Sequence, residues 1–178
     1  MRQQTSREGA VRPLLAFFRY VIEFALCGFC GWLYEEGLEL AVNHAYADRG
    51  LLHLPVLPIY GFGGLLLVWL FRKHKHPVFV FLVSTLVTTV LELAASYPIE
   101  RFVGYLPWDY STWFCNFEGR ISLPSSLLFG GLALLLVNVV DPACDALARK
   151  LPKAALYAIG AVVLAVMVGD FGLVLLGG

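Results

Sequence analysis

The feature that most constrains this chain is a series of five long apolar stretches separated by short polar connections. The stretches cover residues 14–41, 54–71, 77–99, 123–140 and 154–176. A helix needs about 20 apolar residues to cross the hydrocarbon core of a bilayer. These stretches are too long and too uniformly apolar to be the alternating strands of a membrane barrel. We therefore predict an all-α fold, a polytopic bundle of about five transmembrane helices in one membrane domain over residues 1–178.

The composition excludes several other classes of protein. The chain is 59% hydrophobic and only 15% charged, whereas a soluble domain is about half apolar and a quarter charged. Its 13 basic and 13 acidic residues leave no excess positive charge for phosphates, so we expect a lipid bilayer and no nucleic acid as partner. No phosphate-binding loop, nucleophile elbow or zinc-protease motif is present. The sequence therefore assigns no cofactor, no metal ligand and no catalytic residue.

The Lys and Arg residues predict how the chain is oriented in the cell membrane. Ten of them lie in or just after the N-terminal arm (residues 1–13), between the second and third stretches, and between the fourth and fifth; three lie on the other side. Basic residues are retained on the cytoplasmic side of a membrane. We therefore predict a cytoplasmic N-terminus and an external C-terminus. With this orientation the external half carries nine acids and three bases.

Several of the acids on the predicted external side should lie close together. Glu35 is near the outer end of the first helix. Glu92, Ser96 and Glu100 are spaced by four in the third, and residues four apart share one face of a helix. Charged groups within a membrane mark solute or ion paths, or they pair to hold helices together. For Glu92 both interpretations stay open.

The connection between the first two stretches carries two further candidate residues. Arg49 precedes Pro55 and Pro58, and Tyr60 follows them. Because prolines interrupt a helix and leave backbone carbonyls unpaired, this connection is either a stiff turn or the entry of a broken helix that binds a solute.

The connection over residues 101–122 is the most unusual segment. It interleaves aromatic residues with polar ones, among them Trp108, Asp109, Asn116 and Arg120. An interfacial aromatic belt explains the aromatic residues but leaves the polar ones unexplained. We expect a structured external loop that dips back over the outer acids, with Arg120 pairing one of them.

These residues, taken in order, resemble the ABC-transporter type IV family, also called CmpB-like. The resemblance rests on Gly31-Trp32-Leu33-Tyr34-Glu35, Arg49-Gly50, Pro58-Ile59-Tyr60-Gly61 and the polar residues of the 92–121 region, and it covers residues 17–131. The last helix lies outside it. The resemblance implies a transport component. Because the chain contains no ATP-binding domain, ATP-driven transport would require a separate ATPase or another membrane subunit.

Three functions compete on these observations. The first is a transport component that binds a small, cationic solute at an outward-facing acidic site. Its candidate binding residues are Glu35, Arg49, Tyr60, Glu92, Glu100, Trp108, Asp109, Asn116 and Arg120. The second is a non-catalytic interaction subunit of a larger complex, and a homo-oligomer is compatible with either. The third is a membrane-embedded enzyme whose two arginines, Arg49 and Arg120, grip a lipid phosphate while a carboxylate acts as base. We rank transport first and the enzyme last.

Overall fold

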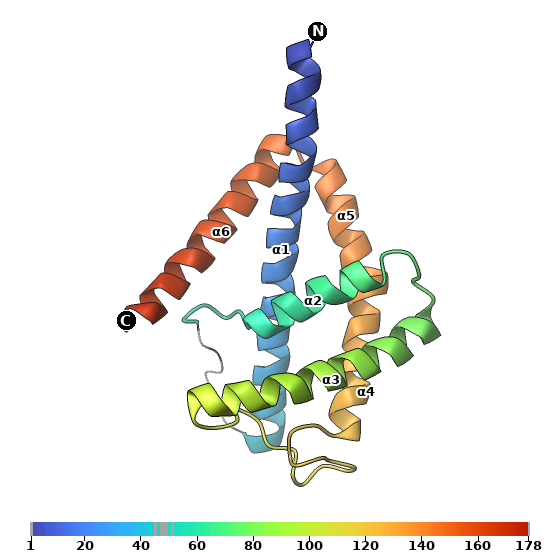
Figure 1. Cartoon of the computed structure of the whole chain (residues 1–178), viewed down its shortest axis with the longest axis vertical. Coiled ribbons are helices and arrows are strands. Elements are labelled where there is room, and N and C mark those ends of the chain that lie inside the picture. Colours follow the sequence, from blue (N-terminus) through green and yellow to red (C-terminus); the bar gives the residue numbers. More distant parts are fainter. Residues whose placement is uncertain (1, 45, 47–49, 51, 178) are drawn as a thin grey trace. The chain divides into compact units, whose positions relative to one another are not determined.

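The computed structural model of this chain describes residues 2–44, 46, 50 and 52–177, and its elements are helices (Figure 1). They are α1 (Arg2–Asn43), α2 (Pro58–Leu70), α3 (Pro77–Val103), α4 (Leu123–Leu135), the π-helical turn η1 (Leu136–Val140), α5 (Asp141–Lys150) and α6 (Lys153–Leu175). The predicted all-α class is confirmed.

Four helical segments of the described chain are long and apolar enough to cross a membrane. They are Pro13–Ala41, Pro77–Val103, Leu123–Lys150 and Lys153–Leu175. The second of the five predicted stretches corresponds to α2, which has only 13 residues. At 1.5 Å per residue it is about 20 Å long, which is shorter than the roughly 30 Å hydrocarbon core. The structure therefore supports four candidate spans and a shorter apolar helix, where the sequence predicted about five spans.

Prolines and glycines explain why two helix boundaries differ from those expected. Helix α2 begins at Pro58 instead of residue 54, because a proline is tolerated in the first turn of a helix but not within it. Helix α3 continues past residue 99 to Val103. Gly104 ends it in the left-handed conformation with φ 88°, and its amide donates to the Glu100 carbonyl, a common helix terminus.

The fourth segment is longer than expected, because it runs without a break from α4 to the end of α5. The expected end at residue 140 coincides with the π-helical turn, in which the Asp141 amide donates to the Leu136 carbonyl. Pro142 follows directly and has no amide hydrogen to continue the regular ladder. A wider turn beside a proline lets the helix continue. The apolar part of the helix is therefore followed, without a break, by a charged part that ends at Lys150.

The chain divides into two compact units, residues 1–66 with 143–178, and residues 67–142. In the first unit, α6 packs against α1. Phe18 of α1 lies over Gly160 of α6, where a β-carbon would come within 2.6 Å of the Phe18 side chain. The Phe18 ring also meets the ring of Tyr157 edge-on, with centroids 5.7 Å apart.

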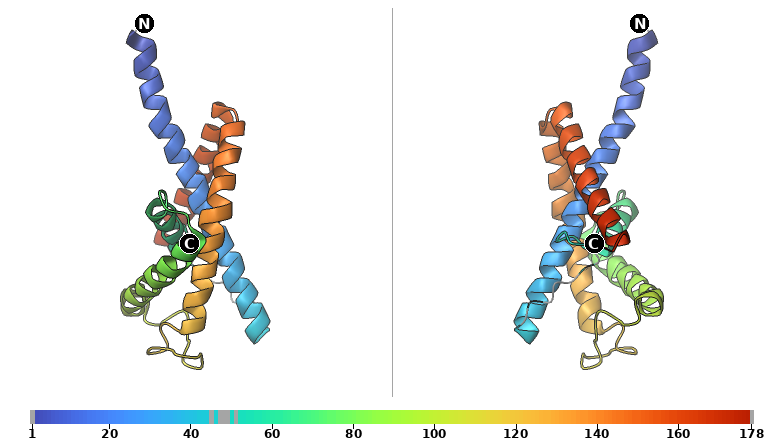
Figure 2. Two further views of the ribbon diagram at one scale, coloured as in Figure 1. Left: turned by 90° about the vertical axis from the view of Figure 1, so that its right-hand side faces the viewer. Right: turned by 90° about the vertical axis from the view of Figure 1, so that its left-hand side faces the viewer.

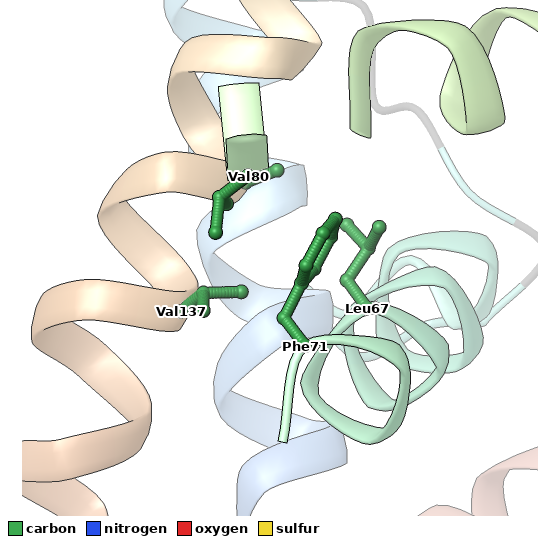
Figure 3. Close-up of a cluster of buried hydrophobic side chains, with 5 residues drawn as sticks. Leu67, Phe71, Val80 and Val137 are labelled. Atoms are coloured by element: carbon green, nitrogen blue, oxygen red, sulfur yellow. The ribbon is translucent and has the colours of Figure 1, made fainter. Parts of the chain in front are cut away.

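In the second unit, α3 packs along α4 and a small apolar core holds them together. The core consists of Leu67, Phe71, Val80, Ala133 and Val137, and Figure 3 shows the labelled side chains pointing toward one another. Further along the same interface the Thr89 hydroxyl donates to the Ser126 hydroxyl at 2.7 Å. The segment of residues 104–122, which we call the α3–α4 loop, extends beyond the ends of these two helices in both views of Figure 2.

Candidate functional site

The polar stripe on α3 is contacted along its whole length by the α3–α4 loop. Oε1 of Glu92 accepts a hydrogen bond of 3.0 Å from the Tyr110 hydroxyl. One turn further, the buried Ser96 hydroxyl accepts from the Arg120 guanidinium at 3.3 Å. After one more turn, Glu100 forms an ion pair with the same guanidinium. The loop therefore dips back over the C-terminal half of α3 and contacts Glu92 and Glu100, which agrees with the predicted contact between the loop and these acids.

Arg120 is the central cation of this arrangement. Besides Glu100, its Nε lies 3.4 Å from Oε2 of Glu118, and its guanidinium lies 4.3 Å from the ring centroid of Tyr97. The hydrogen bond to Glu100 raises the pKa of Arg120 above its already high ordinary value. The prediction that Arg120 pairs one of the outer acids is confirmed. A guanidinium shared in this way resembles a structural clamp more than a free phosphate-binding group.

Asp109 is occupied by the loop itself. Its carboxylate accepts hydrogen bonds from the Ser111 amide at 2.8 Å and the Ser111 hydroxyl at 3.0 Å. Both hydrogen bonds lower the pKa of Asp109, and the bond from the amide has the larger effect. Gly119, with φ 65°, lies directly against this carboxylate, and a β-carbon there would be 2.8 Å from Oδ1. The loop therefore needs a glycine at this position to close around Asp109.

Trp108 and Asn116 also hold the backbone of the loop. The Trp108 indole donates to the Arg120 carbonyl at 2.9 Å. The Asn116 amide donates to the carbonyls of Ser111 and Trp113 at 2.9 and 3.1 Å. The sequence marked these two side chains as ligand contacts. In the structure their polar groups stabilise the loop that covers Glu92 and Glu100.

The first unit contains a second carboxylate bonded to a tyrosine. The Tyr60 hydroxyl at the start of α2 donates to Oε1 of Glu35 on α1 at 2.5 Å. Gly31, one turn before Glu35, lies so close to the Tyr60 ring that no side chain would fit between them. The ring of Tyr34 lies on another side of Tyr60, with centroids 6.4 Å apart. The Gly31-to-Glu35 segment therefore forms the surface against which Tyr60 packs.

The connection before α2 is fixed by a buried acid that the sequence analysis did not assign to the site. Asp170 of α6 is 7% exposed, and its carboxylate contacts His53 Nδ1 at 2.9 Å and the Leu54 amide at 3.2 Å. On α1, the Gly28 carbonyl accepts from the Leu57 amide at 3.0 Å. Figure 1 shows this connection reaching toward the C-terminal half of α6. A lone acid in the last apolar stretch was a signal that Asp170 has a polar partner, but it did not identify that partner.

The predicted site residues thus fall into two groups, one in each unit. The first unit joins Glu35 to Tyr60; the second joins Glu92 and Glu100 to the α3–α4 loop. Arg49 lies outside the described residues. A single site that combines both groups stays a prediction. Within the described part of the chain, no three His, Cys, Asp or Glu side chains are placed to hold a metal ion.

The comparison with protein families is consistent with this arrangement. A family model described as "Putative ABC-transporter type IV" matches residues 22–175. The chain belongs to this family. The match includes α6, so the expectation that the last helix lies outside the resemblance is wrong. No solved structure matches the chain.

As a member of the ABC-transporter type IV family with four candidate spans, the chain is a multi-pass membrane protein related to transport. Both carboxylate–tyrosine pairs lie within the region that matches the family model, as do the α3–α4 loop and Asp170.

Proposed function

We propose that the chain is the membrane component of a transport system and binds a small cationic solute on the predicted external side. The observation that carries this proposal is the hydrogen bond between Tyr110 and Glu92. It joins a half-buried carboxylate in a candidate span to the loop that covers it. Carboxylates at such depth are rare and mark the paths of ions and solutes.

The chemistry of the pair suits a cation that comes and goes. A tyrosine hydroxyl donates a hydrogen bond to a carboxylate without neutralising its charge. The hydroxyl oxygen can itself accept from a cationic group, so the Tyr110 hydroxyl can contact a solute beside Glu92 while its ring stays in place. Glu35 and Tyr60 supply a second pair of the same chemistry.

The α3–α4 loop would then act as a cover whose attachments to α3 differ in strength. Arg120 holds the loop to α3 through Glu100 and Ser96, a charge-assisted contact. Tyr110 attaches another part of the loop to α3 through a hydrogen bond from its neutral hydroxyl to Glu92. A solute cation that competes for Glu92 would release this second attachment first. Because the chain carries no ATP-binding motif, we propose that a separate subunit supplies any ATP-driven step.

The test is cation binding by the purified chain, which requires no energy source. The probes are choline, spermidine and K⁺, titrated by calorimetry against wild type, Glu92→Gln and Glu35→Gln. We expect at least one probe to bind, and each substitution to weaken it about tenfold, equal to roughly 1.4 kcal/mol. Glu39→Gln is the matched control, because it removes an acid one turn beyond Glu35 on the same helix. No binding by any probe, or unchanged binding in both the Glu92→Gln and the Glu35→Gln variant, would refute the proposal.

A second candidate function, an interaction subunit, is favoured by the surface of the α3–α4 loop. Three large aromatic side chains lie on this surface: Tyr105, Phe114 and Phe117 are 64%, 71% and 51% exposed. Aromatic residues exposed on a fixed loop are typical of protein contacts as well as of membrane interfaces. Phe114→Ser should release a partner captured by cross-linking in the native membrane and leave cation binding unchanged. If it weakens only cation binding, the interaction function is excluded.

A further inference from the structure

A pocket of about 370 Å³ lies within the first unit, far along α1 from the carboxylate–tyrosine pair there. It is formed by α1, the end of α5 and the start of α6. Its charged lining residues are Arg19, Asp145, Arg149 and Lys153, and its apolar lining includes Leu15 and Leu156. Its volume is within the range of small-ligand sites, and nothing in the proposed cation function uses it.

Some charged side chains around this pocket are paired with one another and others are not. Arg19 Nε lies 2.9 Å from Oδ1 of Asp145, and its NH2 group lies 3.4 Å from Oε2 of the fully buried Glu23. Asp145, which lines the pocket, and the buried Glu23 are therefore both paired with Arg19. Among the side chains that the structure describes, Arg149 and Lys153 have no hydrogen-bond or ion-pair partner. The pocket thus presents two cations that are available to a ligand.

The backbone at the start of α6 adds to this positive character. The helix begins at Lys153 after Pro152, with no side chain capping its first amides. Free amides at a helix start, together with the helix dipole, favour an anion. They reinforce the two free cations, which carry the argument.

The position of the pocket indicates the kind of anion. The candidate spans in α1 and α6 begin at Pro13 and Lys153, so the pocket residues lie at the level where each helix enters the membrane. Basic pockets at this level bind the phosphate headgroups of anionic lipids. Apolar side chains such as Leu15 and Leu156 can contact the glycerol and first methylenes of such a lipid, which a free phosphate lacks.

We propose that this pocket binds a phosphate-bearing anion, with the headgroup of an anionic phospholipid as its source. Arg149 and Lys153 contact the phosphate. Arg19 of α1, held by Glu23 and Asp145, forms a fixed part of the pocket lining. The site is separate in residues and in ligand charge from the proposed cation site.

The experiment measures ligand binding by the full chain in a zwitterionic detergent. The probes are dioctanoyl phosphatidylglycerol, dioctanoyl phosphatidylcholine and inorganic phosphate. Native mass spectrometry and thermal unfolding measure their binding. The test variant is Arg149→Gln with Lys153→Gln. The matched control is Arg72→Gln with Lys150→Gln, which removes the same charge from exposed residues that do not line the pocket. All four positions are exposed, so both variants should fold, and circular dichroism verifies this.

We expect phosphatidylglycerol to bind and phosphatidylcholine to bind more weakly. The pocket variant should lose at least about tenfold in affinity, because each basic side chain beside an anionic headgroup contributes roughly a fivefold gain. The control variant should retain its affinity. If inorganic phosphate binds as tightly as the lipid and with the same dependence on the variants, the pocket takes phosphate but its source is soluble. Equal loss in both variants, or no preference for the anionic lipid, overturns the proposal.

Discussion

Tyr110 lies 3.0 Å from Glu92 through a hydrogen bond between its hydroxyl and Oε1, and this contact joins the α3–α4 loop to the deepest acid of the polar stripe. Tyr110 is itself fixed within the loop. It is 9% exposed, its amide donates to the Gly119 carbonyl at 2.8 Å, and its ring lies 5.1 Å from that of Trp113. The loop thus delivers a preoriented hydroxyl to a carboxylate that the sequence could interpret in two ways.

Removing this hydroxyl should destabilise the protein measurably. We expect Tyr110→Phe to lower the free energy of unfolding by about 1 kcal/mol, the usual size of a polar contact between membrane segments. Thermal unfolding in detergent measures the change. Tyr105→Phe removes the same atom from a tyrosine that is 64% exposed, so it should have no effect.

A double-mutant cycle that combines Tyr110→Phe with Glu92→Gln separates the hydrogen bond between the two side chains from other effects of each substitution. If the Tyr110 hydroxyl acts through Glu92, the two substitutions should be less than additive, because either one alone disrupts the same contact. Simple additivity would show that Tyr110 stabilises the loop without its bond to Glu92.

The Arg120 clamp should control the opening of the loop. Arg120→Gln removes the ion pairs with Glu100 and Glu118 together. Local opening should then be easier, and we expect the loop amides to exchange hydrogen on the order of tenfold faster by mass spectrometry. Arg101→Gln is the control, since Arg101 is exposed on the neighbouring turn of α3. If exchange in the loop stays at the wild-type rate, Arg120 does not hold it closed.

The apolar stretches and the charges between them were sufficient to predict the class of fold and the contact of Arg120 with the outer acids. Both follow from strong local rules, because apolar length defines a candidate span and an arginine that is only 13% exposed requires a partner. The spacing of Glu92, Ser96 and Glu100 placed them on one helix face, and the loop contacts that face.

What the sequence could not predict depends on contacts between distant segments. The bounds of α2 and of the fourth helix are a different case, because they depend on local signals at Pro58 and Pro142 that apolar length alone does not take into account. The contact of Asp170 with His53 joins residues 117 positions apart, and no local pattern specifies such a partner. For Trp108 and Asn116 the residue types were informative, but a polar side chain in a loop can bind a ligand or the loop's own backbone with equal ease.

Lowering the pH should destabilise the α3–α4 loop, because Asp109 becomes protonated. The Ser111 amide and hydroxyl lower the pKa of Asp109 in the folded protein, whereas the unfolded value is about 3.9. The ionised carboxylate therefore adds stability that is fully present above about pH 4 and is lost as the pH falls through the lower folded pKa. We expect the stability difference between wild type and Asp109→Asn to be largest near neutral pH and to shrink below about pH 4.

Unfolding in denaturant at a series of pH values measures this difference. Ser111→Ala retains the amide bond and removes only the hydroxyl bond, so it should show a smaller effect with the same direction. A difference that grows toward low pH would mean that the loop does not favour the ionised form of Asp109.

The cysteines can decide whether the short helix α2 crosses the membrane. Cys115 lies in the exposed α3–α4 loop, and Cys144 lies in α5. If α2 crosses and the N-terminus is cytoplasmic, Cys115 is external and Cys144 is internal. An impermeant maleimide should then label intact cells only through Cys115, and Cys115→Ser should abolish this signal. Permeabilised cells should gain the Cys144 label.

The charge distribution is why we expect this result. If α2 did not cross, the basic connections at residues 72–75 and 149–153 would lie outside while the basic arm lay inside, which the positive-inside rule disfavours. Cys144 would then be labelled in intact cells and Cys115 would not. A tag on the N-terminus separates this outcome from a fully inverted protein with five crossings, because only the inverted protein exposes the tag on intact cells. A helix of about 20 Å can cross if the bilayer thins around it or flanking side chains reach to the interface, and Arg72 and Lys73 at its end are suited to do so.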